Sequence, residues 1–347
     1  MTDSPTGTAP EDVAASGALG VLADLIHDDP IVRALAAGGE DVVVVPEVAR
    51  GIAFAAAVRQ RASHAPLVIV TPTSSEAEHL AGQLEVYDAG FVAWYPAWET
   101  LPFERVSPNV ETMGRREQVR MHLASEQAPD VIVMGVRALT QRVGPKPPPA
   151  LTVTVAQDCD REALLVALVH FGYRREHQVE ARGEFAVRGS IVDIFPSTAA
   201  HPVRLDFFGD VIERLSEFGI AEQRSVRDLR EIAIVPAREL LITDEVIARA
   251  RHLQSTAPWA QSAWGRLSEG LSFDGMESWL PWLTEPTSIL DSLGDGHRLA
   301  LIDPKRLRDR AADLIAEEQS LANSLAPTWG LESAAGLPSL TLPIEQL

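Results

Sequence analysis

Short apolar runs alternate with helical segments over the first 140 residues, and this alternation restricts the fold. The run Asp41–Val45 (DVVVV) is rich in β-branched residues, as are strands buried on both faces of a sheet. Similar runs lie at 66–71, 91–95 and 130–134. Helical character is found at 20–37, 51–61, 73–87 and 113–126. This alternation of strands and helices predicts an α/β domain with a parallel sheet.

A proline-rich segment separates this region from the next. Four of the six residues of Gly144–Pro149 are proline, which continues neither a helix nor a central strand. Beyond it, Phe208-Gly209-Asp210 has the composition of a tight turn. A helix is predicted at 160–171, and extended segments at 178–187, 190–195, 203–208 and 211–218. We therefore predict a small α+β domain of antiparallel strands over 151–235.

The remaining segments complete the predicted organisation. After Pro236 the chain is again helical, and Arg298–Asp303 (RLALID) is predicted as one more buried strand, followed by a helix at 304–322. This strand is suited to complete the sheet of the first domain. The expected units are a flexible arm at 1–19, a domain split between 20–150 and 236–325, the inserted domain at 151–235, and a linker or tail at 326–347.

Composition excludes several classes of function. The formal net charge of -19 argues against a protein that coats nucleic acid, because that affinity comes from clustered Lys and Arg. The single cysteine, Cys159, rules out an internal disulfide, and nine scattered histidines lack metal-ligand spacing, so no metal site is predicted. No run of about 20 apolar residues or signal peptide is present. We expect a soluble, cytoplasmic protein that does not associate with membranes.

The segment Pro46–Ala53 (PEVARGIA) has the place and spacing of a phosphate-binding loop, G-x-x-x-x-G-K-[ST]. Gly51 is kept, but Pro46 lacks an N–H, Ile52 stands where the lysine belongs, and Ala53 replaces the hydroxyl that holds Mg²⁺. This loop is therefore predicted to be a degenerate Walker A motif that does not bind ATP.

The strand ending in Asp303 has the place of a Walker B motif. There, the first acid binds Mg²⁺ and a second orients the attacking water, but Pro304 occupies the second position and cannot activate water. The alternative is that Gly51 is an ordinary turn glycine and Asp303 a helix N-cap in an unrelated α/β protein. On either interpretation we predict no catalytic residues and no cofactor in this chain.

The segment 203–208 presents two different faces. Alternation places Val203, Leu205 and Phe207 toward a core and puts a mixed set on the other face. That set, with one residue from a neighbouring segment, combines arginine, acid and aromatic side chains as interface anchors do: Arg188, Arg204, Asp206 and Phe208. The alternative is that Arg204 pairs with Asp206 on a solvated surface.

Two other groups have a structural interpretation. Trp279 and Trp282 lie at helical spacing and are predicted to be core residues. Arg115, Arg116 and Arg120 are predicted to form a solvated helix face.

Three longer stretches carry a family resemblance: 95–103 (YPAWETLPF) with Ser107-Pro108, 183–196 (GEFAVRGSIVDIFP) and 204–213 (RLDFFGDVIE). With these stretches the chain, from about 20 to about 318, resembles the N-terminal region of bacterial transcription-repair coupling factors (Mfd), a degenerate copy of the excision-repair helicase UvrB. The resemblance implies a degenerate RecA/UvrB-like parallel-sheet domain, split in two, with the small domain inserted. The tyrosine-rich DNA-clamping hairpin of UvrB has no counterpart, since the chain has three tyrosines in all.

The resemblance also implies partners. In this family the small domain docks onto the ATPase UvrA, and the matching positions here are Arg188, Arg204 and Phe208, with Asp206 adjacent. A C-terminal motor using ATP and Mg²⁺, contacts with RNA polymerase and DNA, and a C-terminal domain masking the UvrA surface belong to the longer protein of which this sequence is expected to be a piece. The alternatives are a working ATP-dependent helicase or translocase and a damage-binding protein that acts alone.

Overall fold

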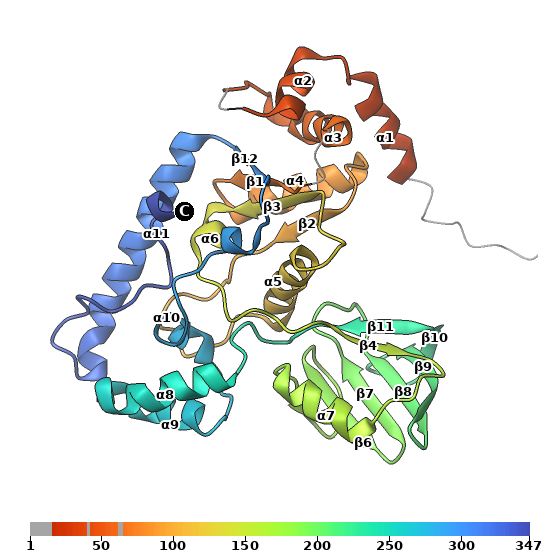
Figure 1. The fold of residues 1–347 in the computed structure, drawn as a ribbon, viewed down its shortest axis with the longest axis vertical. Helices are drawn as coiled ribbons and strands as arrows, with labels where there is room; N and C mark the ends of the chain where they lie inside the picture. Colours follow the sequence, from red (N-terminus) through yellow and green to blue (C-terminus); the bar gives the residue numbers. More distant parts are fainter. Residues whose placement is uncertain (1–15, 40–41, 62–64) are drawn as a thin grey trace, which may run out of the picture.

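A parallel four-stranded sheet organises the first unit in the computed structural model, which describes residues 16–39, 42–61 and 65–347 (Figure 1). The strand order is β12-β1-β3-β2. Every residue of β1 and β3 is buried, as their apolar sequences require. The bounds are β1 Leu67–Thr71, β2 Val92–Tyr95, β3 Val131–Gly135 and β12 Arg298–Leu301. The predicted α/β class, and the late strand that completes the sheet, are confirmed.

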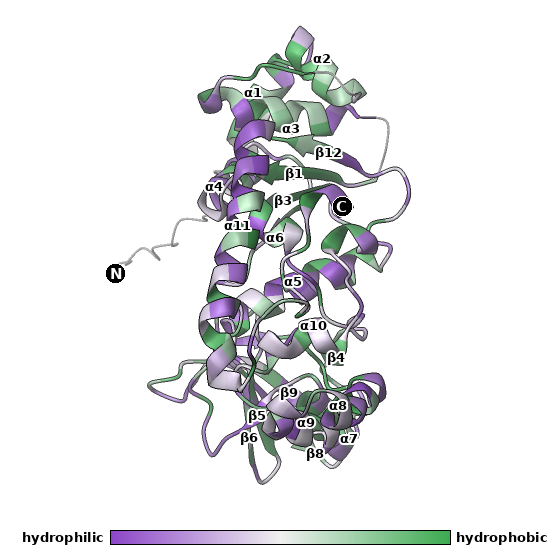
Figure 2. Ribbon diagram, turned by 90° about the vertical axis from the view of Figure 1, so that its left-hand side faces the viewer, coloured by the Kyte–Doolittle hydropathy of each residue, from purple (hydrophilic) through white to green (hydrophobic). Residues whose placement is uncertain are grey.

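Helices cover both faces of this sheet. One core lies between the sheet and α3 (Arg50–Gln60) and α4 (Ser74–Val86); the other lies under α5 (Val110–Leu123), α6 (Val136–Thr140) and α11 (Pro304–Leu325). The short helices α1 (Ser16–Leu25) and α2 (Pro30–Ala37) pack outside α3. Figure 2 shows β1 and β3 as hydrophobic strands in the interior of this unit, whereas α11 alternates hydrophilic and hydrophobic residues.

Three sequence predictions in this unit are wrong. Residues 42–46 form no strand, and the side chains of Val42 and Val44 are 93% and 80% exposed; both neighbours of β1 are other strands, so this run has no buried position in the sheet. The helix expected over 20–37 is two helices, because Pro30 starts a new one capped by Asp29. The strand β12 is an edge strand with Leu299 and Leu301 exposed.

The second unit is a six-stranded sheet of order β10-β9-β8-β7-β6-β5, antiparallel except for the β5–β6 pair. The helix α7 (Arg161–His170) covers one face of it. Gly209, with φ of 63°, forms the expected two-residue turn between β8 and β9. The bounds are β5 Arg174–Arg175, β6 Glu184–Arg188, β7 Ile191–Phe195, β8 Val203–Phe208, β9 Val211–Phe218 and β10 Ser225–Leu229.

Two connections join the units. The outgoing one contains β4 (Leu151–Thr154) and the returning one contains β11 (Glu231–Ile234), and these strands pair antiparallel with each other. After them come α8 (Asp244–Thr256), α9 (Gln261–Ser268) and the short α10 (Leu280–Leu283). Figure 1 shows α11 reaching from the parallel sheet toward α8 and α9. Among the described residues, no helix is both long and apolar enough to cross a bilayer.

Candidate partner-binding surface

The strand β8 has the two faces that its alternation predicts. Val203, Leu205 and Phe207 are buried in the core under α7. Arg204 and Asp206 are half-buried on the other face, and Phe208 is 77% exposed beside the β8–β9 turn. The face is not fully open, however, because a second small core lies on it, formed by Val179, Ala186, Phe195 and Phe218.

A buried carboxylate organises the arginines of this face. Asp193, on the neighbouring strand β7, is 1% exposed and lies opposite Arg204 in the register. Arg204 Nε and Nη2 donate to its two oxygens at 2.7 and 2.9 Å, a bidentate geometry. The hydrogen bond to Asp193 raises the pKa of Arg204, and the Arg204 guanidinium also lies 4.6 Å from the Phe218 ring centroid. Arg204 is therefore held rigidly, with 14% of its side chain exposed.

Arg188 shares the same carboxylate from the other side. Its Nη2 donates to Asp193 Oδ2, and 44% of its side chain remains exposed. Arg204 has a further contact, because its Nη1 donates to the carbonyl of Gln223 at 3.2 Å. The backbone of Gln223 is in the left-handed region, with φ of 54°. The sequence placed the two arginines on neighbouring strands, but Arg188 is on β6 and Arg204 is on β8. The strand β7 lies between them and supplies Asp193, which holds both arginines in one basic group.

Asp206 and Phe208 stand apart from this group. Asp206 lies opposite Ile191 and Arg214 in the strand register. Among the described residues, no ion pair joins Asp206 to Arg204, so the alternative of an Arg204–Asp206 surface pair is wrong. Phe208 is four residues from Arg204 on the same strand, about 13 Å away at the usual rise. The surface therefore combines a rigid guanidinium pair with an exposed phenyl ring at the end of the strand.

The segment with Walker A spacing does not form a phosphate-binding loop. Pro46 precedes a 3-10 turn, η1 (Glu47–Ala49), which runs directly into α3, so Gly51 lies inside the helix. A Cβ at Gly51 would lie 2.7 Å from Gln83 Cβ, so the glycine permits α3 to pack on α4. Ala53 is buried and Ile52 packs against the same core. Both side chains therefore pack toward the core on α3.

The segment in the position of a Walker B motif lies near the Walker A segment, at the carboxyl edge of the parallel sheet. Asp303 has φ of 52° and precedes Pro304, which begins α11; its side chain caps no backbone N–H among the described residues. Arg306 Nη2 donates to Glu76 Oε1 at 2.9 Å, and this bond together with the charges of Asp303 and Glu47 raises the pKa of Arg306. Acidic groups therefore surround the cation at this edge.

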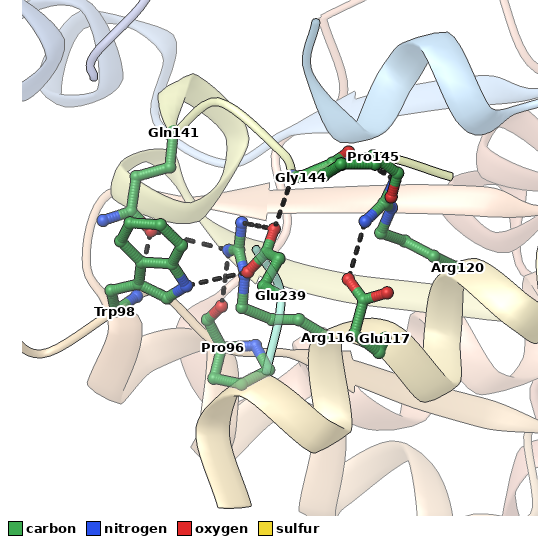
Figure 3. Close-up of polar contacts among 9 residues, drawn as sticks. All are labelled: Pro96, Trp98, Arg116, Glu117, Arg120, Gln141, Gly144, Pro145 and Glu239. Carbon is green, nitrogen blue, oxygen red and sulfur yellow. Dashed lines mark hydrogen bonds and ion pairs between the residues drawn. The ribbon is translucent and has the colours of Figure 1, made fainter. Parts of the chain in front are cut away.

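A buried ion pair ties the returning connection to α5 of the parallel-sheet unit, where the sequence predicted a solvated helix face (Figure 3). Arg116 and Glu239 are both 0% exposed, with Arg116 Nε 2.6 Å and Nη2 3.0 Å from the carboxylate oxygens. Trp98 Nε1 donates to the same carboxylate at 2.8 Å, and the Gly144 N–H does so at 3.4 Å. The prediction fails because Glu239 is 123 residues away from Arg116 and periodicity cannot reveal such a partner.

A second buried pair lies beside the first on α5. Arg120 Nη1 is 2.6 Å from Glu117 Oε1, and its Nη2 donates to the carbonyls of Gly144 and Pro145 (Figure 3). Burial raises the pKa of Glu117 to about 8, and its Oε2 has no hydrogen-bond partner among the residues that the structure describes. Of the three arginines predicted to be solvated, Arg115 alone lies near the surface, 42% exposed.

Comparison with known proteins agrees with this architecture. The profile of the UvrB interaction domain family matches residues 151–240. The chain is 36% identical to the transcription-repair-coupling factor of Mycobacterium bovis over 97% of its own length and 29% of the relative. The chain belongs to the transcription-repair coupling factor family. The factor of Escherichia coli is 31% identical over 64% of this chain and 20% of its own length, and that of Myxococcus xanthus is 35% identical over 76% of this chain.

The chain spans less than a third of the length of these coupling factors. The matched interaction domain contains both the Asp193 group and Phe208. Sequence reasoning missed Asp193 and Gln223; an acid inside the apolar strand IVDIF, in register with an arginine inside VRLDFF, was the available signal for the first. No cluster of three or more His, Cys, Asp or Glu suited to a metal occurs in the described part of the chain.

Proposed function

We propose that this chain is a non-catalytic, cytoplasmic recruitment module that binds the excision-repair protein UvrA. The observation that supports this most directly is the surface on the matched interaction domain: Phe208, 77% exposed, on the same strand as a guanidinium pair that Asp193 holds in place. Aromatic and arginine side chains on a rigid support are typical of interface anchors.

The proposed role of the longer protein follows from the family. Coupling factors would use a C-terminal motor, with ATP and Mg²⁺, to displace stalled RNA polymerase on DNA, while this region brings UvrA to the lesion. We further propose that a C-terminal domain covers Arg188 and Phe208 until the motor acts. The packing of partly buried Ile52 and buried Ala53 against the core supports assigning no nucleotide binding to this chain.

A pull-down of UvrA tests the proposal. The chain should retain UvrA, and Phe208→Ala should weaken binding roughly thirtyfold, since truncating an interface anchor costs about 2 kcal/mol. The matched control is Val166→Ala, an apolar side chain 58% exposed on α7, which lies on the opposite face of the sheet and should bind as wild type.

Two further variants complete the set. Arg188→Ala should act like Phe208→Ala, because this side chain is 44% exposed and leaves Arg204 on Asp193. Phe207→Ala, a buried truncation, should instead lower the melting temperature. Retention of UvrA at the wild-type level by the Arg188→Ala/Phe208→Ala double variant, with an unchanged melting temperature, would place the partner surface elsewhere.

A further inference from the structure

The strand β12 forms an open edge of the parallel sheet. It pairs with β1 on one side, and among the described residues no strand pairs with its other side. The N–H groups of Arg298 and Ile302 donate to carbonyls in β1 and just before it, so these two residues face β1. Alternate residues of a strand in a parallel sheet bond to opposite neighbours. The N–H and C=O groups of Leu299 and Leu301 therefore point away from β1, toward the open side.

The sequence of β12 resembles that of an inner strand. Edge strands of soluble proteins usually carry Lys, Pro or a bulge, which prevent pairing with another strand. Residues 299–302 read LALI, with no charged residue and no proline, and the register of β12 with β1 is continuous. Leu299 and Leu301 are nevertheless 45% and 46% exposed. The edge is therefore apolar, regular and able to pair with a further strand.

The exposed apolar surface at this end of the sheet extends beyond β12. The end of α2 lies beside the first residue of β12, because Arg298 Nη1 donates to the Ala36 carbonyl at 2.8 Å. Figures 1 and 2 both draw α2 beyond β12, at this end of the sheet. The run 42–46 follows α2 in the chain, and its Val42 and Val44 are 93% and 80% exposed without strand pairing. Two apolar segments of strand-like composition are thus exposed at the same end of the sheet.

Charge and chain length select the occupant of this edge. Each copy of the chain carries a net charge of -19, which opposes pairing between two copies. The chain covers 29% of the length of the Mycobacterium bovis coupling factor, so most of such a protein lies outside this region. The sheet already contains a strand from a distant segment, since β12 follows β1 only after the whole inserted domain. A strand of the same protein is therefore the occupant that the charge and the length favour.

We propose that a β-strand from the remainder of the coupling factor pairs with the open edge of β12 and adds a fifth strand to the parallel-sheet unit. Its backbone bonds to the outward N–H and C=O groups of Leu299 and Leu301, and its side chains cover part of both leucines. This strand anchors the rest of the protein on the unit into which the small domain is inserted. The inference rests on the family assignment and not on UvrA binding, so a failure to bind UvrA leaves it standing.

Amide hydrogen exchange resolved to single residues tests the inference, with this chain and the full-length coupling factor that contains it measured side by side. In this chain the amides of Leu299 and Leu301 should exchange fast, whereas that of Ile302, which is bonded to β1, should be protected. In the full-length protein the two leucine amides should exchange about tenfold more slowly or slower still, because a paired amide exchanges only when the strand opens. Equal rates for these two amides in both proteins would overturn the proposal.

A proline substitution separates strand pairing from simple covering of the edge. Leu301→Pro removes an N–H that has no strand partner among the described residues of this chain, and proline is tolerated at such edge positions. This chain should therefore keep its melting temperature, whereas in the full-length protein the added protection of Leu299 should be lost. The matched control Leu301→Ala keeps the N–H and should keep the protection. If Leu301→Pro leaves the protection intact, no strand pairs there and the proposal is overturned. If Leu301→Pro unfolds this chain, the comparison of the two wild-type proteins decides.

A second copy of the chain is the alternative occupant. Analytical ultracentrifugation of this chain, at the concentration used for exchange, should show a monomer. A dimer in which the amides of Leu299 and Leu301 are protected would assign the edge to a second copy and would overturn the proposal.

Discussion

At the scale of single residues, the interior of this chain differs from a purely apolar core mainly through its buried charged side chains. Asp193 and Glu239 are both at most 1% exposed, and each has an arginine partner. A buried acid that loses its partner is costly, because its charge is no longer compensated. Substitutions of these arginines therefore affect folding as well as any partner surface.

Arg204→Ala should lower the free energy of unfolding by about 3 kcal/mol, because Asp193 then keeps Arg188 alone. Removing the acid as well, in Arg204→Ala/Asp193→Ala, should restore part of the loss. Urea unfolding measures both. Equal stability of the single and double variants would show that the buried Asp193 charge does not need Arg204 to compensate it. A loss of UvrA binding by Arg204→Ala alone would thus be ambiguous, whereas Arg188 and Phe208 give a clean result.

Glu117 should make the stability of the chain depend on pH. Its pKa is raised from 4.5 to about 8, so the folded chain keeps a proton that the unfolded chain releases in this window. The free energy of unfolding therefore falls as pH rises from 4.5 to 8, by at most about 1.4 kcal/mol per pH unit. Glu117→Gln should remove this slope, measured by melting temperatures at pH 5 and 8. A Glu117→Gln profile parallel to that of wild type and of the exposed control Glu85→Gln would contradict the assignment.

At the scale of secondary structure, local sequence signals predicted most helices and strands. They failed where the structure of a segment depends on a spatial neighbour that is distant in sequence. Thr73 caps α4 as its position before a helical run indicates, and β1 has the bounds of its apolar run to within one residue. The run at 41–45 failed because a strand needs a free edge, and β12, more than 230 residues later, takes the place beside β1. Likewise, Arg116 and Arg120 follow a surface-like pattern on α5. The partner of Arg116, Glu239, is 123 residues away and could not be inferred locally. Arg120 pairs with Glu117 on the same helix, but the carbonyls of Gly144 and Pro145 that also accept from it are distant in sequence.

The helix α3 supplies the test of nucleotide binding. Titration calorimetry should show no binding of ATP with Mg²⁺ at micromolar concentration. Ile52→Lys, which restores the motif residue, should not create binding, because this position packs against a core; it should lower the melting temperature instead, since a lysine charge would be desolvated. The matched control is Gln60→Lys, at an exposed position on the same helix. Micromolar ATP binding by wild type would contradict the interpretation of the degenerate motif.

At the scale of the whole molecule, the six-stranded unit and the parallel-sheet unit are joined through paired strands. The inserted domain is joined to the parallel-sheet unit by two connections. Glu239, on the returning connection, pairs with Arg116 and accepts a hydrogen bond from the N–H of Gly144, on the outgoing connection (Figure 3). This arrangement presents the β8–β9 turn away from the parallel sheet (Figure 1). A rigid domain on a rigid base suits a docking surface, because little conformational entropy is lost on binding.

The acidic charge of the whole molecule predicts weak binding to duplex DNA. With a net charge of -19, association should be undetectable below micromolar concentration at about 150 mM salt. A gel-shift titration at this salt concentration measures it. A sub-micromolar shift would contradict the inference from charge and would favour a damage-binding role.

Hydrogen–deuterium exchange of the chain with and without UvrA tests the central claim most directly. The account predicts slower exchange in β6, β7 and the β8–β9 turn, which contain Arg188, Asp193 and Phe208, and no change in α7 on the opposite face of the sheet. Protection confined to α8 and α9, or to the carboxyl edge of the parallel sheet, would contradict it.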